Sequence, residues 1–275
     1  MGGEPDPAAP HEFNLSDDLL KPGFGDNSKL PSLNLVVNAM YRITLEGTDL
    51  AGNTGKKFVM SVVYDDIPPD LELVYPVNNS AVNHLDISYS ISEQLNVGEI
   101  VYTRIGGVED PNSPVSINLE ASELETSFDQ PQKTAQVPML NDGTIYNIQL
   151  FGEDLATNNA KSNVIENVKY DITRPRISIY YPTSNSYFMG SDINIEISED
   201  LKEGKMVWTR TGGLSDEVTK QKIPLYDQYL KKGAYEKASL PIEESLSAGV
   251  VYSLGVDAVD FAEKTVFSVA CVFAF

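Results

Sequence analysis

The chain has little of the chemistry that enzymes use. Its 275 residues include one cysteine, Cys271, and two histidines, His11 and His84. A lone cysteine forms no internal disulfide, and so few groups do not assemble a Ser/His/Asp or Cys/His site. P-loop, HExxH and CxxC motifs are also missing from the sequence. The sequence therefore predicts a protein that is not an enzyme.

Long apolar runs and positive charge are scarce as well. No segment approaches the roughly 18 apolar residues expected of a membrane-spanning helix, and the first residues lack the basic and apolar regions of a signal peptide. Lys and Arg number 20 against 40 Asp and Glu, which gives a net charge of −20 and a pI near 4.3. Such a charge repels nucleic acid and anionic membranes. We expect no nucleic-acid binding and no direct membrane insertion, but an acidic surface that keeps the protein in solution and suits divalent cations.

An internal repeat with an offset of 106 residues organises what is present. Tyr-Pro at 75–76 returns at 181–182, and Thr-Arg-x-Gly-Gly at 103–107 returns at 209–213. Self-similarity at a fixed offset is the signature of repeated structural units.

The second half of the repeat is found three times. Its strands open at Tyr41, Tyr146 and Tyr252, and each tyrosine is followed eight residues later by an aspartate. The first ten residues align with the middle of a unit, so we expect the chain to begin inside a repeat. We therefore predict three units, of which the first is the C-terminal half of a repeat: 1–66, 67–172 and 173–275.

Each complete unit is predicted to be a β-sandwich. Its segments alternate between apolar and polar residues and are separated by Gly, Pro, Asn and Asp clusters, which indicates half-buried strands. Inserted segments at 119–124 and 225–230 are typical of short helical turns. Seven strands in about 106 residues fit an antiparallel two-sheet sandwich. The predicted strands of the second unit are 71–75, 85–92, 99–104, 115–119, one near 135–140, 146–153 and 163–170.

A tyrosine corner is predicted in every unit. In 140–146, Leu-Asn-Asp-Gly-Thr-Ile-Tyr has the spacing at which the tyrosine hydroxyl bonds back to the preceding loop. The same spacing precedes Tyr41 and Tyr252. Trp208 and Tyr102 stand on the third strand, where such a sandwich places its large core aromatic.

These motifs resemble a known kind of repeat. The linker Tyr64-Asp65, Ser92-Glu93 after the second strand, Thr-Arg-x-Gly-Gly after the third and Asp-Leu-Ala-Gly-Asn at 49–53 are similar to bacterial immunoglobulin-like and fibronectin type III-like tandem repeats of large adhesin-type surface proteins. The resemblance implies an all-β chain of tandem seven-stranded sandwiches, an extracellular or cell-surface location, and further repeats of the same chain as neighbours. It also implies a spacer or a binding head.

Acidic residues at the junctions between units are candidate calcium ligands. In such a sandwich the incoming linker, the loop after the second strand and the loop after the sixth strand share one pole, and Ca²⁺ takes six to eight oxygen ligands. Acidic turns are also common as solvated surface, because Asp and Asn accept local backbone hydrogen bonds. The candidates are Asp65, Asp66, Glu93, Glu153 and Asp154 for the second unit, and Asp171, Glu199, Asp200, Asp257 and Asp260 for the third.

The sequence is compatible with two functions. The first is a structural or adhesive spacer whose junctions are stiffened by calcium. The alternative is a carbohydrate- or protein-binding module accessory to a larger secreted enzyme, for which Tyr226, Tyr229 and Tyr235 are the candidate contact residues. The incomplete first unit would leave an open apolar face, so we expect residues 1–66 to pair with another chain or to pack on the second unit.

Overall fold

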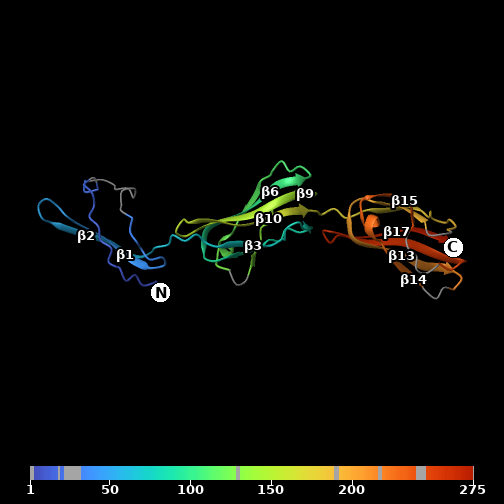
Figure 1. The fold of residues 1–275 in the computed structure, drawn as a ribbon, viewed down its shortest axis with the longest axis horizontal. Coiled ribbons are helices and arrows are strands. Elements are labelled where there is room, and N and C mark those ends of the chain that lie inside the picture. Colours follow the sequence, from blue (N-terminus) through green and yellow to red (C-terminus); the bar gives the residue numbers. More distant parts are fainter. Residues whose placement is uncertain are drawn as a thin grey trace.

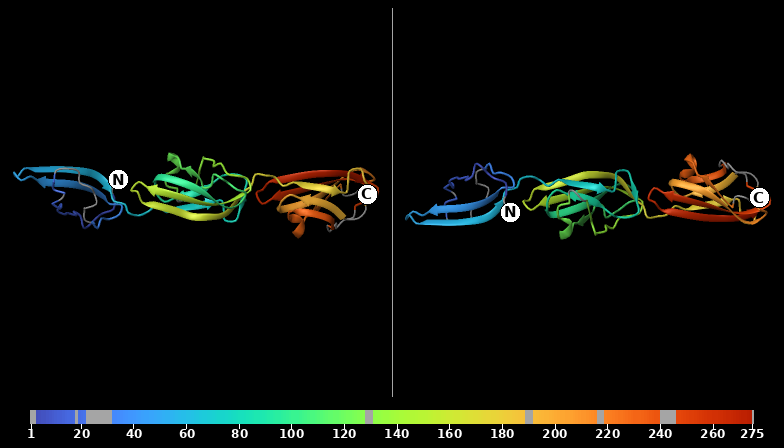
Figure 2. Two further views of the ribbon diagram at one scale, coloured as in Figure 1. Left: turned by 90° about the horizontal axis from the view of Figure 1, so that it is seen from above. Right: turned by 90° about the horizontal axis from the view of Figure 1, so that it is seen from below.

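The computed structural model describes residues 3–17, 19–21, 32–127, 131–188, 192–215, 219–239 and 246–274. Their strands form three groups that lie end to end, with the two chain termini in the first and third groups (Figures 1 and 2). We call these groups the first, second and third units. In the described residues the regular structure is β-strand and short 3₁₀ segments, which confirms the predicted all-β class. None of them belongs to a helix of the length and hydropathy that a membrane span requires.

The first unit is a two-stranded antiparallel sheet of β1 (Met40–Thr48) and β2 (Thr54–Val63). Within the described ranges, β1 pairs with β2 alone. Nearly every side chain of both strands is exposed.

The second unit has a five-stranded sheet in the order β4-β10-β9-β6-β7 and a three-stranded sheet in the order β3-β5-β8. All pairings are antiparallel except that of β10 with β4, which is parallel. Alternate residues of these strands point inward and form one apolar core that includes the fully buried Tyr89 and Ile100. The strands are β3 (Leu71–Tyr75), β4 (Ala81–Val82), β5 (Ser88–Ile91), β6 (Leu95–Gly107), β7 (Val115–Asn118), β8 (Gln132–Lys133), β9 (Thr144–Asp154) and β10 (Asn159–Tyr170).

The third unit has a four-stranded sheet in the order β14-β13-β16-β17 and a three-stranded sheet in the order β11-β12-β15. Trp208 and Tyr252 are fully buried in its core, as Tyr102 and Tyr146 are in the second unit, so these aromatics are core residues as predicted. The strands are β11 (Ile177–Tyr181), β12 (Asp192–Ile197), β13 (Leu201–Gly213), β14 (Lys220–Pro224), β15 (Gly233–Ser239), β16 (Val250–Asp260) and β17 (Thr265–Ala274).

Both predicted helical insertions are 3₁₀ turns, η2 (Ala121–Glu123) and η3 (Asp227–Leu230). In η2 the Glu123 side chain accepts a hydrogen bond from the backbone N–H of Glu120, 2.8 Å away. Such a bond satisfies one of the free amides at the start of a helical turn.

The three predicted tyrosine corners are confirmed. The hydroxyl of Tyr146 accepts a hydrogen bond from the backbone N–H of Asn141 at 3.1 Å. Tyr252 accepts one from Ser247 at 3.0 Å, and Tyr41 accepts one from a loop amide at 2.8 Å. The spacing in the sequence therefore correctly predicts the hydrogen bond between the tyrosine hydroxyl and the preceding loop in each unit.

The strand predicted near 135–140 is wrong. The two-residue β8 lies ahead of this segment, and 135–140 form no strand. Side-chain contacts with other segments hold this stretch, because the backbone N–H of Ala135 donates to the Glu123 carboxylate at 2.6 Å and the Gln136 side chain donates to the carbonyl of Asn118. These side-chain contacts replace the ladder that the alternating pattern predicted.

Candidate metal centre at the junctions

Each junction is built on a turn that begins with a buried aspartate. In the β9–β10 turn, Asp154 is 1% exposed, and its Oδ1 accepts the backbone N–H groups of Ala156 at 2.7 Å and Asn158 at 2.9 Å. Its Oδ2 accepts the Asn158 side-chain amide at 2.9 Å. That amide also approaches the linker carbonyls of Asp65 and Ile67 at 3.3 and 3.4 Å. The turn therefore fixes both Asp154 and the linker that enters the second unit.

The first junction brings three predicted ligands together. Carboxylate oxygens of Asp65, Glu93 and Asp154 lie within 4.8 Å of one another. Burial, followed by the negative charges of Asp65 and Asp154, raises the pKa of Glu93 above its ordinary value of 4.5. Three hard oxygen donors at this spacing match the chemistry that Ca²⁺ prefers.

The second junction repeats the positions with different neighbours. Asp171 is 5% exposed, and its Oδ2 lies 2.5 Å from the Lys169 ammonium. Burial, followed by the charges of Asp171 and Asp260, raises the pKa of Glu199. The oxygens of Asp171, Glu199 and Asp260 do not all lie within 4.8 Å of one another.

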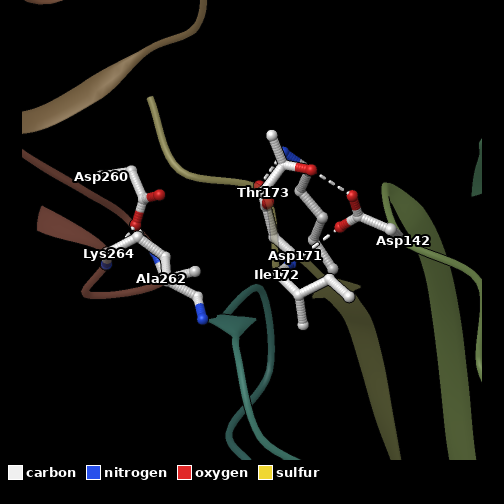
Figure 3. Close-up of polar contacts among 8 residues, drawn as sticks. Asp142, Asp171, Ile172, Thr173, Asp260, Ala262 and Lys264 are labelled. Carbon is white, nitrogen blue, oxygen red and sulfur yellow. Dashed lines mark hydrogen bonds and ion pairs between the residues drawn. The ribbon is translucent and has the colours of Figure 1, made fainter. Parts of the chain in front are cut away.

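Asp260 has an unsatisfied oxygen. Its Oδ1 accepts the backbone N–H groups of Ala262 and Lys264, both at 2.8 Å (Figure 3). Its Oδ2 is buried and has no hydrogen-bond partner, and the residue is 1% exposed. Lys264 stands where the first turn has Asn158, so the side-chain amide that satisfies Asp154 has no counterpart here.

The linker of the second junction is held from the second unit. Asp142 accepts hydrogen bonds from the Ile172 backbone N–H at 2.7 Å and from the Thr173 hydroxyl (Figure 3). Burial acts to raise the pKa of Asp142, but these hydrogen bonds lower it below its ordinary value. A further bond joins the two units directly, from the Asn83 side-chain amide to the carbonyl of Ala262. An open hollow of 710 Å³ lies at this junction, lined by both units.

Four predicted ligands lie outside the two clusters. Glu153 accepts a hydrogen bond from Asn96 at 3.1 Å, and Asp257 pairs with Lys205 at 3.0 Å. Both lie inside strands, between residues that are buried. Successive side chains of a strand alternate between its two faces, so Glu153 and Asp257 point to the opposite face.

The other two candidates outside the clusters have partners of their own. Asp66 is exposed and accepts the Tyr64 hydroxyl at 2.8 Å. Asp200 lines the hollow, but its oxygens accept the Lys231 ammonium and the Lys232 backbone N–H, both at 2.9 Å.

Other candidate groups serve the sandwich itself. His11 lies 2.6 Å from Asp6, which also accepts the Tyr41 hydroxyl, so this pair belongs to a tyrosine corner. Tyr229 and Tyr235 are partly buried against the third core and meet edge to face at 5.3 Å. Tyr226 is 48% exposed. The three tyrosines therefore do not present one flat aromatic platform for a sugar.

Comparisons with known proteins yield structural neighbours. No protein-family model matches the chain, and no curated protein matches its sequence. The fibronectin(III)-like modules of Clostridium thermocellum CbhA align with 12% identity over 74% of this chain and 93% of their own, at a TM-score of 0.31. The chicken CNTN1 FN1-FN3 domains align with 10% identity over 87% of this chain and 78% of their own, at a TM-score of 0.30.

Proposed function

We propose that this chain is a spacer segment of a secreted or cell-surface bacterial protein, and that calcium stiffens its first junction. The observation that carries the proposal is the meeting of Asp65, from the linker, with Glu93 and Asp154, from two turns of the second unit. An ion held by all three would tie the linker to the sandwich that follows it. Calcium sites of extracellular modules have Kd values on the order of 10⁻⁴ to 10⁻³ M.

The proposed ion also explains an otherwise unfavourable arrangement. In the structure, burial and then the charges of both aspartates raise the pKa of Glu93, so the ionised carboxylates repel one another. A divalent cation would turn this repulsion into attraction. The linker would then have a fixed direction, as a rigid spacer requires.

Thermal unfolding in millimolar calcium and in chelator, at equal ionic strength, tests the site. A ligand that binds only the folded state adds RT ln(1 + [L]/Kd), which is about 1.4 kcal/mol at a concentration ten times Kd. For a unit of this size we expect the second unit's midpoint to rise by about 6–11 °C. Calorimetry reports all units, whereas the fluorescence of the single tryptophan, Trp208, reports the third.

A matched pair of variants locates the effect. Glu93→Gln should abolish the calcium shift, and Glu199→Gln, at the corresponding position of the third unit, should preserve it. Magnesium should not reproduce the shift, because it demands octahedral geometry and dehydrates reluctantly. If calcium leaves every midpoint unchanged, the three carboxylates hold no calcium and the calcium proposal is wrong.

The open edge of the first unit supports a proposal about partners. Ile43, Leu45 and Phe58 are each more than half exposed, and β1 lacks the second neighbour that its counterparts β9 and β16 have within the described residues. Such edges and faces associate, and we propose that this chain self-associates through β1. Sedimentation velocity should show a dimer that Ile43→Lys dissociates, and a monomer at all concentrations would contradict it.

A further inference from the structure

The two junctions differ at one position beside the linker aspartate. Lys169, near the end of β10, occupies the position that Val63 occupies at the end of β2, with the repeat offset of 106 residues. Asp171 and Asp65 follow two residues later in the two linkers. The same backbone position therefore carries an ammonium group in one junction and an isopropyl group in the other.

The Lys169 ammonium lies among the acidic groups of the second junction. It is 2.5 Å from Asp171, and the side chain of Asp171 is only 7% exposed, so this pair is shielded from water on one side. Burial acts to lower the pKa of Lys169, but the hydrogen bond and charge of Asp171, followed by the charges of Glu199 and Asp142, raise it. The same ammonium acts to lower the pKa of Glu199. Lysine therefore neutralises part of this cluster.

Neutralisation of the second cluster is incomplete. The buried Oδ2 of Asp260 has no hydrogen-bond partner, although Asp260 acts on Glu199 electrostatically and lines the same hollow. In Figure 3 this oxygen points away from the turn that binds the other one. A buried carboxylate oxygen without a donor is energetically costly, and a cation beside it would offset that cost. The second junction therefore retains the chemistry of a cation site.

We propose that Lys169 is the resident cation of the second junction, and that its ammonium excludes a divalent ion from a latent site formed by Asp171, Glu199 and Asp260. The inference rests on the proposed calcium site at the first junction for its contrast. A tethered ammonium makes the second junction independent of free calcium. One chain then carries a calcium-dependent hinge and a calcium-independent hinge in series.

Calcium titration of the ¹⁵N-labelled full chain, followed by NMR, separates the two junctions. Amides of Ala156 and Asn158 report the first turn, and amides of Ala262 and Lys264 report the second. In the wild type we expect saturable shifts at the first turn alone. In Lys169→Met, which keeps the apolar stem and removes the charge, we expect saturable shifts at both turns. Lys169→Gln should behave in the same way.

Two further variants control for overall charge and for position. Lys202 lines the same hollow but pairs with Glu263, so Lys202→Met should leave the second turn silent. Val63 is 50% exposed and tolerates a polar side chain, and Val63→Lys should abolish the shifts at the first turn.

Each other outcome is decisive. Shifts at the second turn in the wild type, or shifts created equally by Lys202→Met, would overturn the role of Lys169. Silence of the second turn in both Lys169 variants, with the first turn responding, would overturn this inference and leave the proposed function intact. If the first turn shows no calcium shifts but the second turn responds in Lys169→Met, the calcium site of the proposed function is wrong and the role of Lys169 stands. If neither turn shows calcium-induced shifts in any variant, both proposals are wrong.

Discussion

The first and second junctions place the same acidic groups on the same backbone and stabilise them differently. In the first, the Asn158 amide satisfies Asp154 and reaches the linker carbonyls, and the three carboxylates converge. In the second, Lys169 pairs with Asp171, and Asp142 holds the linker from the other side.

Two substitutions are enough to change how such a junction is stabilised. With asparagine at the last position of the turn, both oxygens of the buried aspartate have hydrogen-bond donors. With lysine at that position, one oxygen has none. At the end of the preceding strand, the first junction has valine and the second has lysine, so only the second cluster has a positive charge at this position. The backbone scaffold of the turn is the same in both, because the Oδ1 of each aspartate accepts the same two turn amides.

Removal of the turn aspartate should have the largest effect and should differ between the units. Asp154 accepts three hydrogen bonds and Asp260 accepts two. Hydrogen bonds to charged groups contribute about 1.5–3 kcal/mol each and are not additive. We expect Asp154→Ala to lower the free energy of unfolding of the second unit by about 3 kcal/mol, and Asp260→Ala to cost the third unit about 2 kcal/mol.

Urea unfolding measures both costs, with Trp208 fluorescence for the third unit and amide NMR intensities for the second. If Asp260→Ala cost as much as Asp154→Ala, the unsatisfied oxygen of Asp260 would not matter and the comparison would fail.

An exchange of the turn residues should move the two units in opposite directions. Asn158→Lys leaves a buried Asp154 oxygen without its donor, which costs about 1–3 kcal/mol. Lys264→Asn supplies that donor to Asp260 and should stabilise the third unit by about 1 kcal/mol. The same urea titrations measure both changes. A loss of stability in Lys264→Asn would contradict the structural equivalence of the two turns.

The smallest effect concerns pH in the absence of calcium. The folded-state pKa of Glu93 lies above 4.5, so its contribution to stability is fully present below the unfolded-state value and is lost as the pH rises through the folded-state value. At neutral pH in chelator, Glu93→Gln should therefore raise the midpoint of the second unit, with a gain in the free energy of unfolding of less than about 1 kcal/mol. Glu199→Gln should likewise raise that of the third unit, because burial and then the charges of Asp171 and Asp260 raise the pKa of Glu199, although the Lys169 charge opposes the rise.

Midpoints measured from pH 4 to 8 in chelator test this, and the variants should show a weaker loss of stability with rising pH than the wild type. A wild-type midpoint that increased steadily over this range, with the same slope in Glu93→Gln, would show that Glu93 is not repelled by its neighbours.

Much of the fold could be predicted from the sequence because the repeat supplies several copies of each signal. The tyrosine corners, the core aromatics and most strands of the second unit lie where the period-two pattern and the turn residues placed them. The pattern failed at 135–140, where the Glu123 side chain captures a backbone amide, and it missed the two-residue β4, which is too short to alternate. Such contacts depend on tertiary neighbours rather than on local sequence.

The candidate site was predicted too broadly. The pole of the sandwich was the right place to look for neighbouring carboxylates, but strand alternation could already have excluded two candidates. Asp257 stands between Val256 and Ala258, which are both buried, and Glu153 stands in the same way beside buried Gly152. The sequence prediction missed Lys169 because it considered only acidic residues as members of the junctions. Its charge was visible in the alignment of the repeats.

Distances measured across the two junctions show whether calcium fixes the first linker and leaves the second unaffected. In a Cys271→Ser background, spin labels at exposed Lys57, Lys161 and Lys222 give one pair across the first junction, 57 with 161, and one across the second, 161 with 222. Pulsed EPR in chelator and in calcium gives the width of each distance distribution. We predict that calcium narrows the distribution of the first pair and leaves the second unchanged. A first pair that is equally broad in both conditions, or two pairs that respond alike, would contradict the account.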